Sequence, residues 1–281
     1  MTDAATVHAM LQLLATIRYE VLPAPATEAK VVQHLPSDRV VTITCSPSKG
    51  LEHTLELTER LAGHGYPVVP HLAARMISGR AELAEIVDRL TGLGVTAVFV
   101  PAGDAEPVGQ YRDALAVLID LAELGSPFDH IGITGYPESH PTIHDDVTIQ
   151  SMWDKRPHAT HIVSNLTFSA PVVRDWITRM RARGVTVPVL LGVPGPVERS
   201  KLLAMATKIG VGESTRFLAK NKGLFARLAA PGGFTGERFV LDCARALRSP
   251  ETAVAGLHVY TFNQIAETEA WRADLFDRLA G

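Results

Sequence analysis

Short apolar runs alternate with longer amphipathic segments along the whole chain. The runs are rich in β-branched residues and mostly lack polar alternation, which is typical of strands buried on both faces. Eight such runs are predicted to be strands, at Arg18–Leu22, Val40–Cys45, Pro67–Leu72, Thr96–Pro101, His130–Gly135, Thr160–Leu166, Val187–Val193 and Gly256–Phe262.

The segments between the strands have helical periodicity. Leu83, Ile86, Val87 and Leu90 recur at spacings of three and four, with charged residues on the opposite face. Strands that alternate with helices predict a single (β/α)₈ barrel over residues 1–281, with a doubly wound sheet as the alternative. The stretch 198–248 is too long for one helix, and its glycines and proline predict extra helices between the seventh and eighth strands.

Composition excludes several classes of protein. With 46% apolar and 20% charged residues the chain is an ordinary globular protein, and a net charge of −3 without charge blocks argues against nucleic-acid or anionic-membrane partners. Two cysteines cannot form a disulfide framework or a zinc cage. We find neither a convincing signal peptide nor an apolar run long enough for a bilayer, so we expect a cytoplasmic protein of undetermined oligomeric state.

Polar residues cluster at the predicted strand ends. In a (β/α)₈ barrel the active site lies at the carboxyl ends of the strands, so these residues are candidates for function. Seven of the eight strands contribute, through Glu20, Thr44, Cys45, His71, Gly103, Asp104, Tyr136, Glu138, His140, Ser164, Asn165, Tyr260 and Asn263.

Glu20 is the strongest candidate. A carboxyl group inside a barrel loses hydration, which favours the protonated form and suits a general acid; the alternative is an ion pair with Arg18 at the surface. Asp104 is explained equally well as a turn residue. His71 and His140 have no third ligand at suitable spacing, so we predict no metal site.

In order, these strand ends resemble the methylenetetrahydrofolate reductase family of (β/α)₈ barrels. The specific elements are Tyr-Pro-Glu-Ser-His-Pro at Tyr136–Pro141 and Gly-Leu-His-Val-Tyr-Thr-Phe-Asn at Gly256–Asn263. Looser matches are Tyr19–Pro23, Pro70–Leu72, Gly103–Asp104 and Ser164–Phe168. The resemblance implies reduction of 5,10-methylenetetrahydrofolate to 5-methyltetrahydrofolate, a step of one-carbon metabolism and methionine biosynthesis.

The resemblance also implies roles for the candidates. Glu20 corresponds to the general acid, Asp104 to the residue that stabilises the cationic intermediate, and Asn165, with Tyr260, to residues that hold the folate. The residues expected to shape the cofactor face are Thr44, His71, Gly103, Tyr136 and His140. The expected partners are a folate and NADH, with NADPH not excluded.

Bound FAD is doubtful, because four positions depart from the flavin-binding pattern of that family. They are Ala102, Gln150, Trp153 and Asp154, which supply no cation for the flavin phosphates. We therefore expect direct hydride transfer from NADH. The alternatives are a folate-dependent methyltransferase or demethylase on the same barrel, and a non-catalytic folate-binding subunit.

Overall fold

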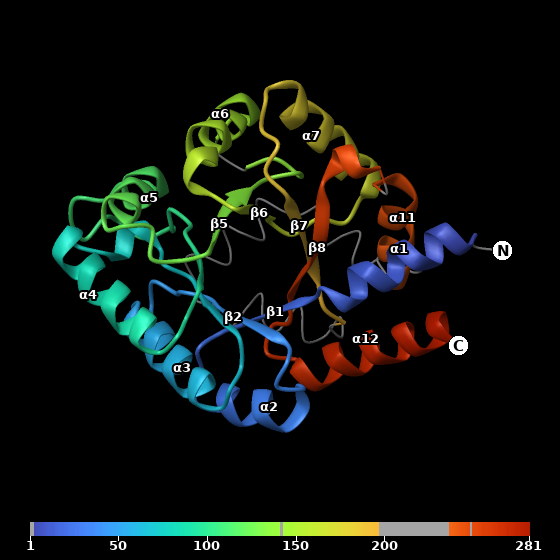
Figure 1. Cartoon of the computed structure of the whole chain (residues 1–281), viewed down its shortest axis with the longest axis horizontal. Helices are drawn as coiled ribbons and strands as arrows, with labels where there is room; N and C mark the ends of the chain where they lie inside the picture. The colour runs from blue at the N-terminus through green and yellow to red at the C-terminus, as the bar shows by residue number, and fades with distance from the viewer. Residues whose placement is uncertain (1–2, 141–142, 197–235, 248) are drawn as a thin grey trace.

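The strands surround a central axis in a computed structural model that describes residues 3–140, 143–196, 236–247 and 249–281 (Figure 1). Each predicted strand is confirmed, with ends that shift by up to two residues. The strands are β1 Arg18–Val21, β2 Val40–Ile43, β3 Val68–Pro70, β4 Ala97–Phe99, β5 His130–Gly135, β6 His161–Ser164, β7 Val189–Pro194 and β8 Val254–Tyr260.

The described strands form one parallel sheet that curls into a barrel. Their order is β3-β2-β1-β8-β7-β6-β5-β4, so the first and last strands of the chain are neighbours. The two ends of this order meet through a bridge between His71 and Phe99, where the Leu72 amide donates to the Phe99 carbonyl at 2.8 Å. The arrangement confirms the predicted (β/α)₈ barrel over the doubly wound alternative.

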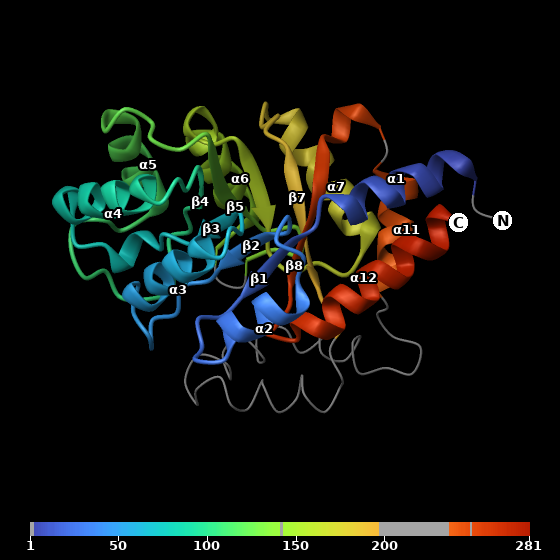
Figure 2. The ribbon, with the colours of Figure 1, turned by 60° about the horizontal axis from the view of Figure 1, so that its bottom comes forward.

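Helices pack around the outside of this barrel (Figure 2). Each buries one apolar face; α4, for example, buries the predicted stripe that begins at Leu83. The helices are α1 Ala4–Ala15, α2 Thr27–His34, α3 Glu52–Gly63, α4 Arg80–Gly92, α5 Ala114–Glu123, α6 Asp145–Lys155, α7 Ala170–Ala182, α11 Gly236–Ala246 and α12 Ile265–Ala280, with short 3₁₀ turns η1 Ala74–Met76, η2 Arg156–His158 and η4 Pro250–Thr252.

Alternation along the strands separates the barrel interior from the helix layer. On β1, Tyr19 and Val21 are fully buried in the main core, and Arg18 and Glu20 point the other way, into the barrel. A separate apolar cluster of Val69, Phe99, Val163 and Leu190 fills the middle of the barrel. Arg18 and Glu20 thus lie towards opposite ends of β1 on the face that lines the barrel.

The predicted insertion between the last two strands is seen in part. Helix α11 lies within it, and the remaining helices predicted there fall outside the described residues. Helix α1, which precedes the first strand, packs against α11 and β8. No helix in the described ranges has the length and apolar character needed to cross a membrane.

Candidate active site

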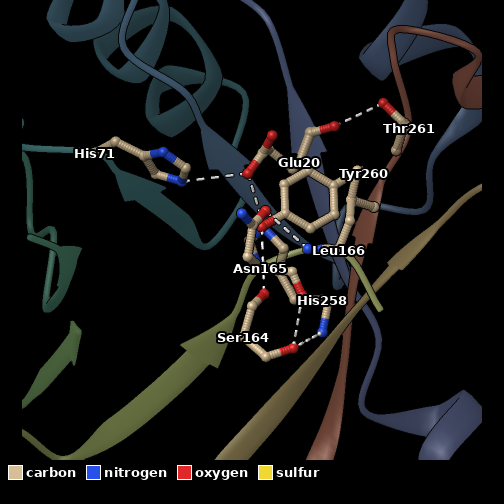
Figure 3. Close-up of polar contacts among 9 residues, drawn as sticks. Glu20, His71, Ser164, Asn165, Leu166, His258, Tyr260 and Thr261 are labelled. Atoms are coloured by element: carbon tan, nitrogen blue, oxygen red, sulfur yellow. Dashed lines mark hydrogen bonds and ion pairs between the residues drawn. The ribbon is translucent and has the colours of Figure 1, made fainter. Parts of the chain in front are cut away.

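Three titratable side chains meet at the carboxyl ends of β1, β3 and β8 (Figure 3). His258 Nε2 lies 2.9 Å from Glu20 Oε2, and His71 Nε2 lies 3.8 Å from the same oxygen. The pairing of β1 with β8 brings Glu20 beside Tyr260 and Arg18 beside His258, which explains how residues from opposite ends of the chain converge. We call Glu20, His71 and His258 the Glu–His cluster.

Burial differs within the Glu–His cluster. The side chains of His71 and His258 are 5% and 1% exposed, whereas that of Glu20 is 15% exposed and reaches the barrel mouth. Burial lowers the pKa of His71 to about 4, although the Glu20 charge opposes this, so His71 is neutral near pH 7. His71 Nε2 and His258 Nδ1 have no hydrogen-bond partner among the described residues.

Thr261, the residue directly after β8, holds the backbone of Glu20 in place. The Thr261 hydroxyl donates to the Glu20 carbonyl at 2.6 Å, and the Thr261 amide donates to it at 3.2 Å. Arg18, the alternative ion-pair partner of Glu20, instead lies 3.0 Å from His161 Nε2. Glu20 therefore pairs with the histidines inside the barrel rather than with Arg18 at the surface.

A hydroxyl network borders the Glu–His cluster. The Tyr260 hydroxyl donates to the Ser164 carbonyl at 3.3 Å, and the Tyr260 ring meets the His258 ring edge-on at 5.0 Å between centroids. Burial, with the Glu20 charge, raises the pKa of Tyr260 well above its usual value, so this phenol keeps its proton. Asn165 is exposed next to Ser164, and its Oδ1 accepts from the Leu166 amide at 2.8 Å.

The structure thus brings together four of the predicted site residues, Glu20, His71, Asn165 and Tyr260 (Figure 3). Among the others, Tyr136 interacts with a residue of its own loop and with one of the loop after β4. Tyr136 and His140 meet edge-on at 4.9 Å between ring centroids, and burial together with the charge of the exposed Asp104 raises the pKa of Tyr136.

Two further predicted residues have structural explanations. Gly103 has φ +85°, and a Cβ there would lie 3.2 Å from the Cβ of Ala73, so this turn requires glycine. Thr44 is half-buried just after β2, and its carbonyl accepts from the Thr54 hydroxyl at 3.0 Å. Neither observation tests the predicted cofactor face.

Sequence reasoning assigned no role to His258 or Glu138. His258 lies two residues before Tyr260 on one face of β8, so strand alternation with barrel closure was a usable signal that places it beside Glu20. Glu138 Oε1 accepts from the Phe168 amide at 3.1 Å and from the Thr167 hydroxyl at 3.4 Å, which ties the loop after β5 to the loop after β6. No spacing in the sequence indicates these contacts of Glu138.

The positions that made FAD doubtful mostly make local contacts. Gln150 Nε2 donates to Asp154 Oδ1 at 2.9 Å along α6, and the guanidinium carbon of Arg156 lies 3.8 Å from the centroid of the Trp153 ring. The Ala102 carbonyl accepts from the Arg75 amide at 3.0 Å. These contacts leave flavin binding a prediction.

No model of a known protein family matches the chain. A solved structure of a putative lyase/mutase from Burkholderia cenocepacia J2315 is similar over 99% of this chain and 87% of that one, at 13% identity and a TM-score of 0.51. A structure of 2,3-dimethylmalate lyase, a member of the PEP mutase/isocitrate lyase superfamily, covers 89% of this chain and 98% of its own, at 11% identity and a TM-score of 0.47.

The first of these structures is named a putative lyase/mutase, which points away from the methylenetetrahydrofolate reductase family, and that prediction is corrected. The functions inferred from that family are corrected with it. They are the reduction of 5,10-methylenetetrahydrofolate, the oxidoreductase class, the place in one-carbon metabolism and methionine biosynthesis, and the folate-based alternatives. The physical reason is that any barrel enzyme needs polar groups at its strand ends, so short motifs such as Pro70–Leu72 report the location of a site and not its reaction. No contact in the described part of the chain tests whether the protein binds NADH, NADPH or a folate.

Proposed function

We propose that the protein is an enzyme in which Glu20 transfers a proton to or from a small molecule bound at the carboxyl ends of the barrel strands. The observation that carries this proposal is the position of Glu20 Oε2, 2.9 Å from one imidazole nitrogen and 3.8 Å from another, on a side chain that still reaches the mouth. A cytoplasmic location, which the free thiols of Cys45 and Cys243 favour, belongs to the same proposal.

The surroundings of Glu20 suit proton transfer. An imidazole nitrogen can donate a hydrogen bond to a carboxylate or accept one from a carboxylic acid, so His258 Nε2, 2.9 Å from Glu20 Oε2, can partner either form of that group. The protonated phenol of Tyr260 and the neutral imidazole of His71 add hydrogen-bonding groups without adding charge.

The likeness to a structure named a putative lyase/mutase supports the fold, and the proposed chemistry rests on Glu20. Lyases that break a carbon–carbon or carbon–oxygen bond next to a carbonyl group move a proton to or from carbon or oxygen. Small hydroxy acids and keto acids are therefore the first compounds to assay.

Deuterium incorporation tests the proposal. The protein, treated with a chelator, is incubated in D2O with a panel of small hydroxy acids and keto acids, and exchange at carbon is followed by proton NMR. Glu20→Gln removes the proton carrier with little change of shape, and we expect exchange to slow by about 10²–10⁴-fold. Glu85→Gln, at an exposed position on α4, is the matched control and should exchange like the wild type. Exchange by Glu20→Gln at the wild-type rate would exclude Glu20 as the proton carrier.

A further inference from the structure

The two imidazoles and one carboxyl group of the Glu–His cluster have the composition of a transition-metal site. The ligating atoms of Glu20, His71 and His258 all lie within 4.8 Å of one another. Two ligand atoms of a tetrahedral zinc ion are about 3.3 Å apart, given Zn–N and Zn–O distances of about 2.0–2.1 Å. The observed separations of 2.9 Å and 3.8 Å from Glu20 Oε2 lie on either side of that value.

A second observation is independent of that composition. His71 Nε2 is buried, points at Glu20 Oε2, and has no hydrogen-bond partner in the described part of the chain, although its side chain is only 5% exposed. A buried polar atom without a partner costs free energy unless a ligand satisfies it.

We propose that the Glu–His cluster binds one Zn²⁺ ion through Glu20, His71 Nε2 and His258 Nε2. Two imidazoles with one carboxylate favour Zn²⁺, Co²⁺ and Ni²⁺, whereas Mg²⁺ and Ca²⁺ prefer sites made of oxygen atoms. Glu20 reaches the mouth, so a fourth coordination position on that side is open to water or to a small anion.

The surroundings set the strength of this site. A histidine that binds a metal usually donates its other ring N–H to an acceptor, and loss of such a partner lowers affinity by about 10–100-fold. His258 Nδ1 has no such partner among the described residues. We therefore expect exchangeable binding that a chelator reverses, rather than a permanently held structural ion.

Bound Zn²⁺ and proton transfer by Glu20 exclude each other, because a carboxylate oxygen that holds the ion cannot carry the proton. Deuterium exchange measured with a chelator therefore reports on the proposed function, and metal binding without substrate reports on this inference. Either can fail without the other. The inference predicts, in addition, that Zn²⁺ inhibits any exchange that depends on Glu20.

The direct test titrates chelator-treated protein with Zn²⁺ by calorimetry and with Co²⁺ by visible absorbance. We expect one ion per chain, Co²⁺ bands of the intensity typical of four-coordination, and no binding of Mg²⁺ under the same conditions. His71→Gln and His258→Gln should each weaken Zn²⁺ binding by at least about 10-fold.

The control is His64→Gln, which removes a surface imidazole that also lies 3.0 Å from a carboxylate, that of Glu28, and should leave the high-affinity binding unchanged. Circular dichroism checks that the variants fold. If a histidine variant does not fold, Glu20→Gln combined with X-ray absorption of the wild-type zinc complex replaces it, with two imidazole ligands expected. Absence of one-to-one binding by the wild type, or equal loss in His64→Gln, would overturn the proposal.

Discussion

One hydroxyl at the end of β6 connects two strands next to the Glu–His cluster. Ser164 is fully buried, its Oγ accepts from the Gly192 amide of β7 at 2.7 Å, and it donates to the Asn165 carbonyl at 2.9 Å. The backbone carbonyl of Ser164 accepts a hydrogen bond from the Tyr260 hydroxyl. Ser164 therefore fixes the position of Asn165 relative to β7 and β8.

Removal of this hydroxyl should destabilise the protein. In Ser164→Ala the buried Gly192 amide loses its acceptor, and we expect the free energy of unfolding to fall by about 1–3 kcal/mol. Ser48→Ala, which removes an exposed hydroxyl 3.0 Å from that of Ser46, should change the free energy of unfolding by less than about 0.5 kcal/mol. Urea unfolding of both variants measures the difference, and equal stabilities would contradict the role given to Ser164.

At this scale, the sequence predicted the residues that stand at the ends of continuous apolar strands. Glu20 and His71 are such residues, since each is a polar group where an apolar run ends. Their contact partners could not be predicted in the same way. The 2.9 Å contact of His258 with Glu20 depends on the pairing of the first strand with the last, and the contacts of Glu138 depend on two loops.

At the scale of elements, β7 approaches β6 so closely that a side chain cannot fit between them. A Cβ on Gly192 would lie 2.1 Å from the Ser164 carbonyl oxygen and 2.8 Å from that of Asn165, both of them backbone atoms. Because backbone cannot rotate away as a side chain can, β6 would have to move. The glycine thus allows the strand spacing that holds Asn165 at the mouth.

Gly192→Ala tests this packing. We expect a loss of about 1–3 kcal/mol in the free energy of unfolding, as for other overpacked interiors. The control is Gly63→Ala at the end of α3, where a Cβ would meet nothing within 4 Å and where alanine is expected to stabilise by up to about 1 kcal/mol. Thermal unfolding of the two variants should move in opposite directions, and a neutral Gly192→Ala would show that β6 adapts.

Strand existence was predictable because strands covered by helices are apolar on both faces, but strand ends were not. Residues Val254 and Ala255 precede the predicted start at Gly256, and they join β8 through its pairing with β7, where the register shifts near Val189. The predicted strand Pro67–Leu72 is shorter in the structure, at Val68–Pro70. Both differences come from the partner strand, which a local pattern does not contain.

Over the whole molecule, the barrel interior is apolar in the middle and polar at both ends. At the amino-terminal end, His161 of β6 and Arg18 of β1 meet across the barrel, with Arg18 Nη1 3.0 Å from His161 Nε2. Because a guanidinium only donates, Nε2 must accept, and Nδ1 carries the proton beside the Thr160 hydroxyl at 3.0 Å. The closed barrel therefore requires a neutral His161.

This requirement makes stability depend on pH. Burial, with the Arg18, His130 and His258 charges, lowers the pKa of His161 to about 3, whereas the unfolded chain has the ordinary value of about 6.5. Between these values the unfolded state binds more protons, so the contribution of His161 is complete above about pH 6.5 and is lost as the pH falls towards 3. Acidification from pH 7.5 to pH 5 should lower the free energy of unfolding by about 2 kcal/mol through protonation of His161 in the unfolded chain.

Urea unfolding at pH 7.5 and pH 5 measures the loss in the wild type and in His161→Gln. Glutamine can still accept a hydrogen bond from Arg18 but cannot be protonated in this range, so the variant should lose about 2 kcal/mol less than the wild type on acidification. Some loss remains in the variant, because His71 also has a lowered pKa, of about 4. If both proteins lose the same amount, His161 is protonated in the folded barrel, and its bond to Arg18 does not depend on a neutral imidazole.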